Sequence, residues 1–263
     1  FLKSLEKFQQ FLSFVAFKHK MDINVLNADL EDFAKEEKNN LLKTTNLPSG
    51  SLVCDIGAGV AHLTIKLAER GLNILAVEPN LAMRKHGINR TAHFKNVSWA
   101  IGTGEHTEQL DQSFDLVTFG SSFNVTDRNK ALIETKRILK PLGWFACMWN
   151  HRDLTDPIQQ EIEATIKKWV PQYDYGARRE DQTPIIEQSN FFSPVIKTQG
   201  SITYTQDIED CIEAWRSHGT LERQATNLFP NIVSDIEKLL KGKNLKNIQI
   251  PYTTKIWMAQ LKT

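Results

Sequence analysis

Two short apolar segments, residues 51–56 and 73–78, flank a glycine turn at 57–59 and a stretch with helical periodicity at 61–70. Runs of this length and composition favour strands, and Gly71 is placed to end the helix. A strand, a helix and a second strand in close succession favour a βαβ unit, because parallel strands need a crossover that is usually helical. Sheets built from such units bind ligands at the carboxyl ends of their strands.

The same alternation continues further along the chain. Strand-like and helical patterns that alternate predict an α/β fold with a mostly parallel sheet and helices on both faces. Helices are expected at residues 81–89 and 127–139, and strands at 97–101, 114–119 and 144–149, the last after a Pro-Leu-Gly break at 141–143.

The segments before and after this region have different sequence patterns. Residues 1–18 are expected to form a helix with five phenylalanines, which either packs in the core or forms a lid over a pocket. After residue 150 we expect helices at 157–170, 208–218 and 232–240, a polar loop at 171–189, a strand pair or one bent strand at 194–206, and a period-2 strand at 248–258. The expected domains are a helical lid at 1–46, a core at 47–155, cap helices with the sixth-strand region at 156–247, and a final core strand at 248–263.

The charge balance limits the classes of partner. The 263 residues carry 32 Lys and Arg against 31 Asp and Glu, a net charge of +1, so the composition favours neither nucleic acid nor an anionic membrane. The longest apolar stretch is far shorter than the roughly 20 residues of a membrane-spanning helix. Neither the three cysteines, Cys54, Cys147 and Cys211, nor the histidines show metal-ligand spacing. We therefore expect no metal site, and a reduced cytoplasmic protein that acts on a small molecule.

The residues at the glycine turn indicate which kind of cofactor the chain binds. Asp55 ends the first expected strand, Gly57, Ala58 and Gly59 form the turn, and Glu78 follows 19 residues after Gly59. Glycines let a cofactor approach the backbone closely, and an acid at the end of the second strand can accept hydrogen bonds from both ribose hydroxyls. The pattern favours an adenosine-containing cofactor. A bare Gly-x-Gly turn that only reverses the chain is the structural alternative.

Asp55 discriminates between two such cofactors. A dinucleotide places a pyrophosphate at this turn, and a carboxylate beside it would repel that group. S-adenosyl-L-methionine instead presents an ammonium and a sulfonium, which a carboxylate attracts directly or through water. The third glycine of a dinucleotide fingerprint is also replaced, by Ala61. Electrostatics therefore favours S-adenosyl-L-methionine over NAD.

Residues 55–61 resemble the first motif of class I S-adenosylmethionine-dependent methyltransferases, Asp/Glu-x-Gly-x-Gly-x-Gly, with Ala61 at the last glycine. Four further segments follow in that family's order, so the resemblance covers about residues 50–150. It implies a Rossmann-like fold with a seven-stranded sheet, a ribose-binding acid, an adenine-contacting segment after the third strand, and a loop after the fourth strand beside the methionine part of the cofactor. The cofactor-binding residues that it implies are Asp55, Gly57, Ala58, Gly59, Glu78, Pro79, Asn80, Met83, Gly104, Glu105, Gly120, Ser121, Ser122 and Phe123.

Within this family the chain is most similar to the methyltransferase type 11 set, and resembles trans-aconitate methyltransferases. Residues 149–153, Trp-Asn-His-Arg-Asp, match the Trp-Asn-x-Arg-Asp that often follows their fifth strand. One position departs from the pattern: Asn124 stands where the subgroup often has His.

Methyl transfer requires alignment of the nucleophile, exclusion of water and, for some acceptors, removal of a proton. The catalytic candidates after strands four and five are Asn124 and His151, the latter as a general base because imidazole titrates near neutrality. A satisfied structural histidine is the alternative. The candidate substrate-binding residues are Asn150, Arg152, Tyr173, Tyr175 and Arg178, since arginine binds carboxylates well; ion pairing, helix capping and a solvated loop are the structural alternatives.

The expected function is methyl transfer from S-adenosyl-L-methionine to a small organic molecule, a secondary metabolite or its precursor. Two other classes remain open at this point. One is a catalytically silent module that binds S-adenosylmethionine or a partner, and the other is an NAD(P)-dependent oxidoreductase on a similar sheet.

Overall fold

The computed structural model describes residues 41–263, which form two compact units. Of these residues, unit 1 holds 151–176 and 201–253, and unit 2 holds 41–150, 177–200 and 254–263. The helix expected at 1–18 and most of the lid expected at 1–46 lie outside the described residues. The strands β5 (Leu139–Arg152), β6 (Ile196–Asp207) and β7 (Asn247–Gln260) contribute residues to both units.

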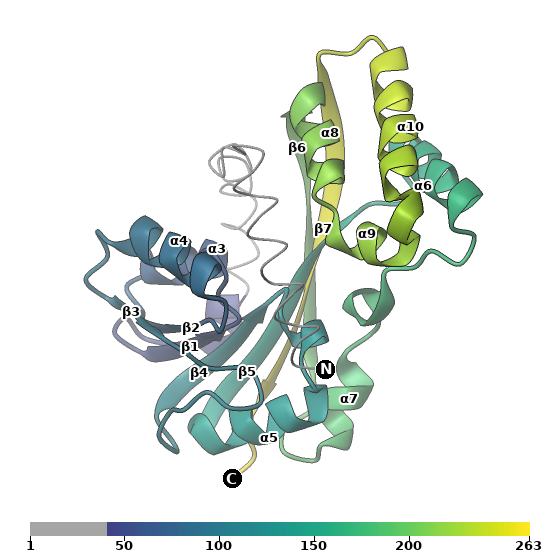
Figure 1. Cartoon of the computed structure of the whole chain (residues 1–263). Helices are drawn as coiled ribbons and strands as arrows, with labels where there is room; N and C mark the ends of the chain where they lie inside the picture. Colours follow the sequence, from purple (N-terminus) through teal and green to yellow (C-terminus); the bar gives the residue numbers. More distant parts are fainter. Residues whose placement is uncertain (1–40) are drawn as a thin grey trace. The chain divides into compact units, whose positions relative to one another are not determined.

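The described strands form one seven-stranded sheet in the order β3-β2-β1-β4-β5-β7-β6 (Figure 1). β1 (Leu52–Ile56) pairs in parallel with β2 (Asn73–Val77) on one side and with β4 (Phe114–Gly120) on the other. β2 pairs in parallel with β3 (Val97–Ala100), and β4 with β5. The strand order therefore reverses between β1 and β4, which is the switch point where α/β sheets bind ligands. The seven-stranded, mostly parallel sheet predicted from the sequence is confirmed.

Alternate side chains along the strands of unit 2 belong to two separate hydrophobic cores. Val53, Leu116 and Ala146 belong to one buried cluster, which includes residues of α3 (His62–Ala68). Cys54 and Val117, their neighbours in sequence, belong to a second cluster, which includes residues of α5 (Arg128–Ile138). Successive side chains of a strand point to opposite faces, so helices cover both faces of this sheet. Figure 1 shows α3 and α4 (Leu81–Thr91) on one side and α5 on the other.

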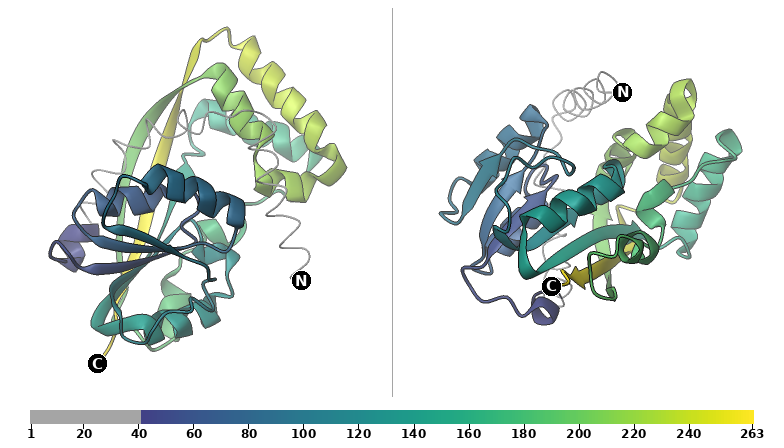
Figure 2. Two further views of the ribbon diagram at one scale, coloured as in Figure 1. Left: turned by 60° about the vertical axis from the view of Figure 1, so that its left-hand side comes forward. Right: turned by 90° about the horizontal axis from the view of Figure 1, so that it is seen from below.

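Unit 1 has its own core, built from four helices. These are α6 (Pro157–Trp169), α8 (Ile208–Arg216), α9 (Gly219–Ala225) and α10 (Phe229–Gly242). α10 packs against both α8 and α6, and Figure 2 shows α8 and α10 side by side. Ile212, Trp215 and Ile236 are fully or almost fully buried in this core.

Four details differ from the sequence-based expectation. The loop expected at 171–189 contains the short helices η2 (Gly176–Arg179) and α7 (Thr183–Gln188), and α9 was not anticipated. Such short helices carry little periodic signal because tertiary contacts, rather than local preference, stabilise them. The break at 141–143 lies inside β5 as a register irregularity against β4. Of the two alternatives expected at 194–206, a strand pair or one bent strand, the structure has one strand, β6.

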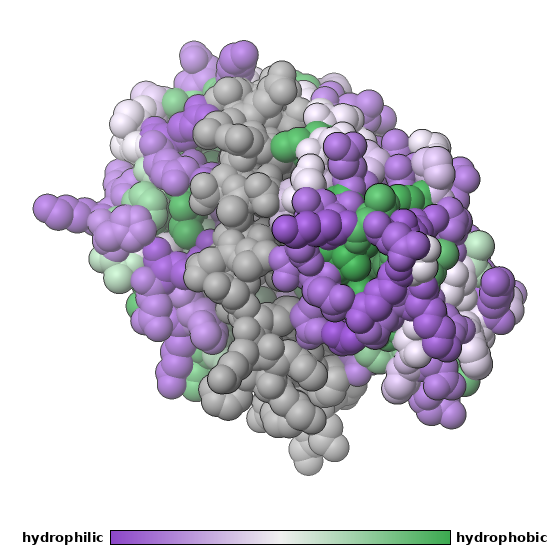
Figure 3. Space-filling view, turned by 90° about the horizontal axis from the view of Figure 1, so that it is seen from above, coloured by the Kyte–Doolittle hydropathy of each residue, from purple (hydrophilic) through white to green (hydrophobic). Residues whose placement is uncertain are grey.

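The described residues contain no helix that is long and apolar enough to cross a membrane. Among them there is also no group of three or more metal-ligating side chains that could hold an ion. Hydrophilic residues cover most of the described surface in the view of Figure 3, with smaller hydrophobic areas between them.

Candidate functional site

The turn after β1 lies at the switch point of the sheet and depends on two glycines. Gly57 and Gly59 have φ values of +67° and +58°, in the left-handed region where glycine carries no steric penalty. A Cβ on Gly57 would lie 2.4 Å from the Cβ of Ser122, and the Ser122 hydroxyl donates to the carbonyl of Ile56 at 2.5 Å. The backbone N–H groups of Gly57 and Ala58 both donate to the Val77 carbonyl, at 2.8 and 3.1 Å. The turn is therefore fastened to β2 and packed against the segment that follows β4.

Glu78 joins the turn to the end of β2. Its Oε2 accepts from the backbone N–H of Gly59 at 2.9 Å, and its Oε1 accepts from that of Asn80 at 2.8 Å. The carboxyl is 5% exposed, and burial raises its pKa against the lowering effect of these two hydrogen bonds. Each carboxylate oxygen has a second lone pair, so Glu78 can still accept two hydroxyl hydrogens.

Asp55 supports the turn from within the sheet. Its two oxygens accept from the hydroxyls of Thr64, at 2.6 Å, and Thr118, at 2.9 Å. The residue is 1% exposed, and burial raises the pKa of its carboxyl to about 6 despite these hydrogen bonds. Asp55 therefore joins α3 to β4 beneath the turn and presents no exposed oxygen there.

Ala61 explains why the family motif has glycine at its position. The residue has φ 74°, also in the left-handed region, and is the N-cap of α3. Its side chain is fully buried and supplies no capping hydrogen bond. An alanine in this conformation costs roughly 1–2 kcal/mol.

The start of α4 lies beside the turn. Asn80 caps this helix, because its Oδ1 accepts from the backbone N–H groups of Ala82 and Met83, at 2.9 and 3.0 Å. A Cβ on Gly59 would lie 3.2 Å from the Cε of Met83. Arg84 donates to the carbonyls of Glu78 and Pro79, at 2.5 and 3.2 Å. The glycine turn and the first turn of α4 therefore form one connected surface at the carboxyl end of the sheet.

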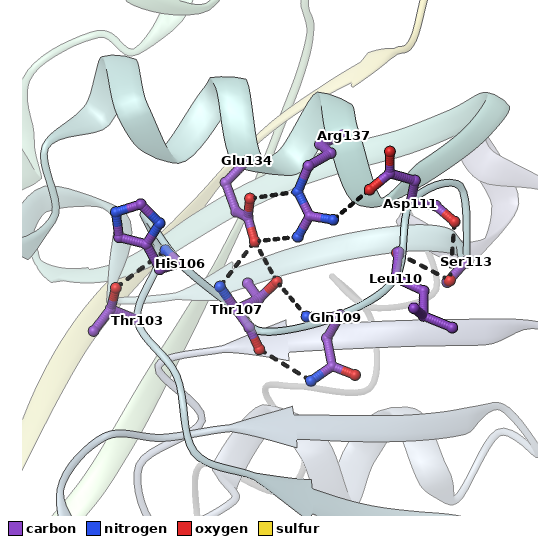
Figure 4. Close-up of polar contacts among 9 residues, drawn as sticks. All are labelled: Thr103, His106, Thr107, Gln109, Leu110, Asp111, Ser113, Glu134 and Arg137. Atoms are coloured by element: carbon purple, nitrogen blue, oxygen red, sulfur yellow. Dashed lines mark hydrogen bonds and ion pairs between the residues drawn. The ribbon is translucent and has the colours of Figure 1, made fainter.

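The segment after β3 is held by α5 (Figure 4). Glu134 of α5 accepts from the backbone N–H and the hydroxyl of Thr107, at 2.8 and 2.5 Å, and pairs with Arg137 at 2.7 Å. Burial opposes ionisation of Glu134, but the hydrogen bonds from Arg137 and Thr107 outweigh it and lower the pKa to about 2. Glu105 in the same segment accepts from the backbone N–H of Asp127 at 2.7 Å, ahead of α5.

The segment after β4 lies between the glycine turn and the segment after β3. Ser122 contacts Gly57, as described above, and Thr126 lies so close to Gly104 that a Cβ there would be 2.6 Å from the Thr126 Cγ2. Ser121 has φ 61° and donates its N–H to the Met148 carbonyl at 2.9 Å. A Cβ on Gly120 would lie 3.1 Å from Leu63 of α3, and the Phe123 ring is fully buried. Unit 2 thus brings the predicted cofactor-binding segments together.

The remaining candidate catalytic and substrate-binding residues lie partly in unit 2 and partly in unit 1. In unit 2, Asn124 accepts from the Trp149 indole at 2.8 Å, Asn150 accepts from the Thr254 hydroxyl at 2.7 Å, and Arg178 donates to the Asn150 carbonyl at 3.5 Å.

In unit 1, Arg152 donates to the Tyr252 hydroxyl at 3.1 Å, and its guanidinium lies 4.4 Å from the centroid of the Trp215 ring. Tyr173 and Tyr175 stack edge to face at 5.3 Å, and His151 is 6% exposed.

Sequence reasoning missed four residues of this arrangement: Thr64, Thr118, Trp149 and Glu134. Thr118 is the polar residue in the middle of an apolar strand, and Glu134 is a buried charge on a helix. Both are sequence signals that could have been followed, because buried polar groups need partners. Their partners are 63 and 27 residues away in the chain, so spacing alone does not reveal the pairs.

Comparison with known proteins shows similarity to methyltransferases. Residues 54–147 match the model of a family described as "Methyltransferase domain". An uncharacterized methyltransferase of Mycobacterium tuberculosis is 37% identical over 101 residues, 38% of this chain and 40% of that protein. A demethylmenaquinone methyltransferase of Staphylococcus epidermidis is 28% identical over 183 residues, 66% of this chain and 75% of that protein. The chain thus aligns with less than half the length of the mycobacterial relative.

A solved structure shares the fold at low sequence identity. A putative type II methyltransferase from Anaeromyxobacter dehalogenans superposes with a TM-score of 0.59 at 16% identity, over 86% of this chain and 97% of that one. The resemblance to trans-aconitate methyltransferases stays a prediction. Residues 54–147 are thus similar to a methyltransferase domain, and the chain shares the fold of a solved putative methyltransferase.

Proposed function

We propose that this protein transfers a methyl group from S-adenosyl-L-methionine to a small organic molecule. The observation that carries the proposal is the turn between β1 and α3, where Glu78 binds the Gly59 N–H at the switch point of the sheet. In this proposal, Glu78 is the acid that binds the ribose beside the glycine turn.

The residues at the turn fit the cofactor. Gly57 and Gly59 let the turn pack directly against Ser122 and Met83, where a Cβ would not fit, and Glu78 keeps two lone pairs for ribose hydroxyls. Met83 offers an apolar contact for the adenine, and the segment 102–105 is held in place by α5. When bound, the cofactor supplies a methyl group on a positive sulfur. This chain's residues then bind and orient the reactants and exclude water.

The small-molecule acceptor is supported by the relatives and by the charge. Two relatives are named for methylation in quinone biosynthesis: the demethylmenaquinone methyltransferase above and a ubiquinone/menaquinone biosynthesis C-methyltransferase of Rickettsia akari. The net charge of +1 offers no general attraction for a polyanion. From these relatives we take only that the methyl acceptor is a small organic molecule. We propose that this acceptor is a secondary metabolite or its precursor.

Glu78 is also the residue that tests the proposal. Calorimetry with S-adenosylhomocysteine should show binding, and NAD should show none. Glu78→Ala should weaken that binding roughly 10- to 100-fold, because a hydrogen bond to a charged group is lost. Glu108→Ala, which removes an exposed acid, is the control and should bind as the wild type does. Binding of NAD without S-adenosylhomocysteine would overturn the proposal.

Methyl transfer itself needs a second measurement. Tritiated S-adenosylmethionine incubated with a low-molecular-weight metabolite extract should give labelled products that the Glu78→Ala variant does not form. Tight binding of S-adenosylhomocysteine with no transfer to any fraction would favour the silent binding module instead.

A further inference from the structure

We infer that Asn124 donates a hydrogen bond from its amide to an oxygen of the methyl acceptor, and that Trp149 holds the amide in the orientation that makes this possible. This inference rests on the proposed methyl-transfer function and names the chemistry of the acceptor. It makes the acceptor a molecule with an electron-rich oxygen, such as a phenolate, near the reacting atom.

The orientation of the amide follows from its partner. The Trp149 indole nitrogen lies 2.8 Å from Oδ1 of Asn124. An indole N–H can only donate, so the amide atom facing it must be the carbonyl oxygen. The amide NH₂ is then the end turned away from Trp149, and it has no hydrogen-bond partner within residues 41–263.

Trp149 is well suited to fix this orientation. Its side chain is 1% exposed and packs edge to face on Trp257, with ring centroids 5.7 Å apart. Trp257 in turn donates its indole N–H to Asp181 at 2.8 Å. An indole buried and packed in this way keeps its N–H direction constant, so Trp149 is a positioning residue and Asn124 is the group that meets the acceptor.

Asn124 also lies in the segment where a methyl acceptor is expected. It belongs to the short helix η1 (Phe123–Val125) directly after β4. Ser122, two residues before it, contacts Gly57, and Thr126, two residues after it, contacts Gly104. Both contacts are with segments proposed to hold the cofactor. The side chain of Asn124 is partly exposed, as a group that meets a ligand must be.

The chemical consequence is a preference among acceptors. An NH₂ donor stabilises an oxygen lone pair, most strongly an anionic one. It offers nothing to an ammonium, which can only donate, and less to an uncharged amine nitrogen, which is a weaker acceptor than an anionic oxygen. An oxygen that becomes more negative as the acceptor ionises would thus be bound in its reactive form.

The test uses a pair of probes of the same size, 4-nitrophenolate and 4-nitroaniline, added to protein saturated with S-adenosylhomocysteine. Nuclear magnetic resonance of ¹⁵N-labelled protein follows the side-chain NH₂ signals of Asn124, which are identified by their loss in Asn124→Asp. We expect 4-nitrophenolate to shift these signals and to bind at least tenfold more tightly than 4-nitroaniline.

Three variants separate the donor role from a structural one. Asn124→Asp preserves the bond to Trp149 but replaces the donor with a negative oxygen, so phenolate binding should fall roughly 10- to 100-fold. Asn129→Asp adds the same charge at an exposed position nearby and should have little effect. Trp149→Phe removes the indole donor together with part of the packing on Trp257, and should weaken phenolate binding about threefold to tenfold without changing the affinity for S-adenosylhomocysteine.

The outcomes are distinct from those of the proposed function. If S-adenosylhomocysteine does not bind, the proposed function fails. If it binds, but 4-nitrophenolate binds no better than 4-nitroaniline, binds equally to Asn124→Asp, or does not bind, the inference about Asn124 is wrong and the proposed function stands.

Discussion

Asp55 is a carboxylate held inside a sheet by two threonine hydroxyls. The energetic cost of its burial is visible in its pKa, which rises from the ordinary 3.8 to about 6. A group whose pKa is higher in the folded than in the unfolded protein takes up a proton on folding when the pH lies between the two values. Asp55 therefore destabilises the protein above pH 6, and this effect fades as the pH falls toward 4.

Replacement of Asp55 by asparagine tests this sign. The variant cannot ionise at this position, so it should not lose stability as the wild type does when the pH rises from 4 to 7. The free energy of unfolding of the variant minus that of wild type should therefore increase by up to about 3 kcal/mol over this range. Urea unfolding of the ligand-free protein across this pH range measures the difference. Glu108→Gln, at an exposed acid, is the control and should show no such slope. A constant difference between Asp55→Asn and wild type at every pH would contradict the assignment.

At the scale of elements, the segment after β3 depends on α5. Glu134→Gln preserves the shape of the side chain but removes the charge that binds Thr107 and Arg137. We expect a loss of about 1.5–3 kcal/mol in unfolding free energy and a severalfold weaker affinity for S-adenosylhomocysteine, measured by urea unfolding and calorimetry. Glu180→Gln removes the partner of Arg128, at the start of the same helix, in an exposed ion pair, and should cost less than about 1 kcal/mol. Equal losses of unfolding free energy in Glu134→Gln and Glu180→Gln would show that the burial of Glu134 with Thr107 and Arg137 adds no stability.

A second element-scale prediction concerns the packing of α4 on β3. Gly87 lies in the middle of α4, and a Cβ there would be 2.1 Å from the Trp99 ring. Gly87→Ala should therefore destabilise the protein by about 1–3 kcal/mol, although alanine is the better helix former.

The same substitution in a Trp99→Leu background should have the opposite sign. With the ring removed, Gly87→Ala should stabilise by up to about 1 kcal/mol through helix propensity. A double-mutant cycle by chemical unfolding measures the coupling. If the two substitutions prove additive, close packing on Trp99 is not the reason for glycine at this position.

The elements that sequence predicted well are those in which local preference and tertiary role agree. β1, the glycine turn, α3 and β2 combine strand-forming residues, positive-φ glycines and a helix ended by Gly71, and all point to the same structure. α7 and α9 were missed because they have six and seven residues and depend on tertiary contacts. The contact of Glu78 with the glycine turn could be foreseen from its spacing in the chain. The pairing of Asp55 with Thr118 and of Asn124 with Trp149 could not, because each pair forms across separate strands or loops.

At the scale of the whole molecule, the two units have separate hydrophobic cores. Ile236→Ala removes a fully buried side chain of unit 1, and Leu116→Ala does the same in unit 2. Each should cost about 2–5 kcal/mol. Hydrogen exchange should then rise mainly in α6, α8 and α10 for the first variant and mainly in β1 and β4 for the second. The first variant should bind S-adenosylhomocysteine within about threefold of wild type. Equal loss of protection in both units for either variant would show that they unfold together.

The chain passes between the units four times: inside β5, β6 and β7, at residues 150–151, 200–201 and 253–254, and in η2, at residues 176–177. Unit 1 is therefore no detachable module joined by a linker. An exchange of this unit with that of a relative would need matched junctions inside three strands, each with its register preserved, since a slip of one residue turns every side chain to the other face. Changes in unit 1 are thus more accessible through point substitutions than through exchange of the whole unit.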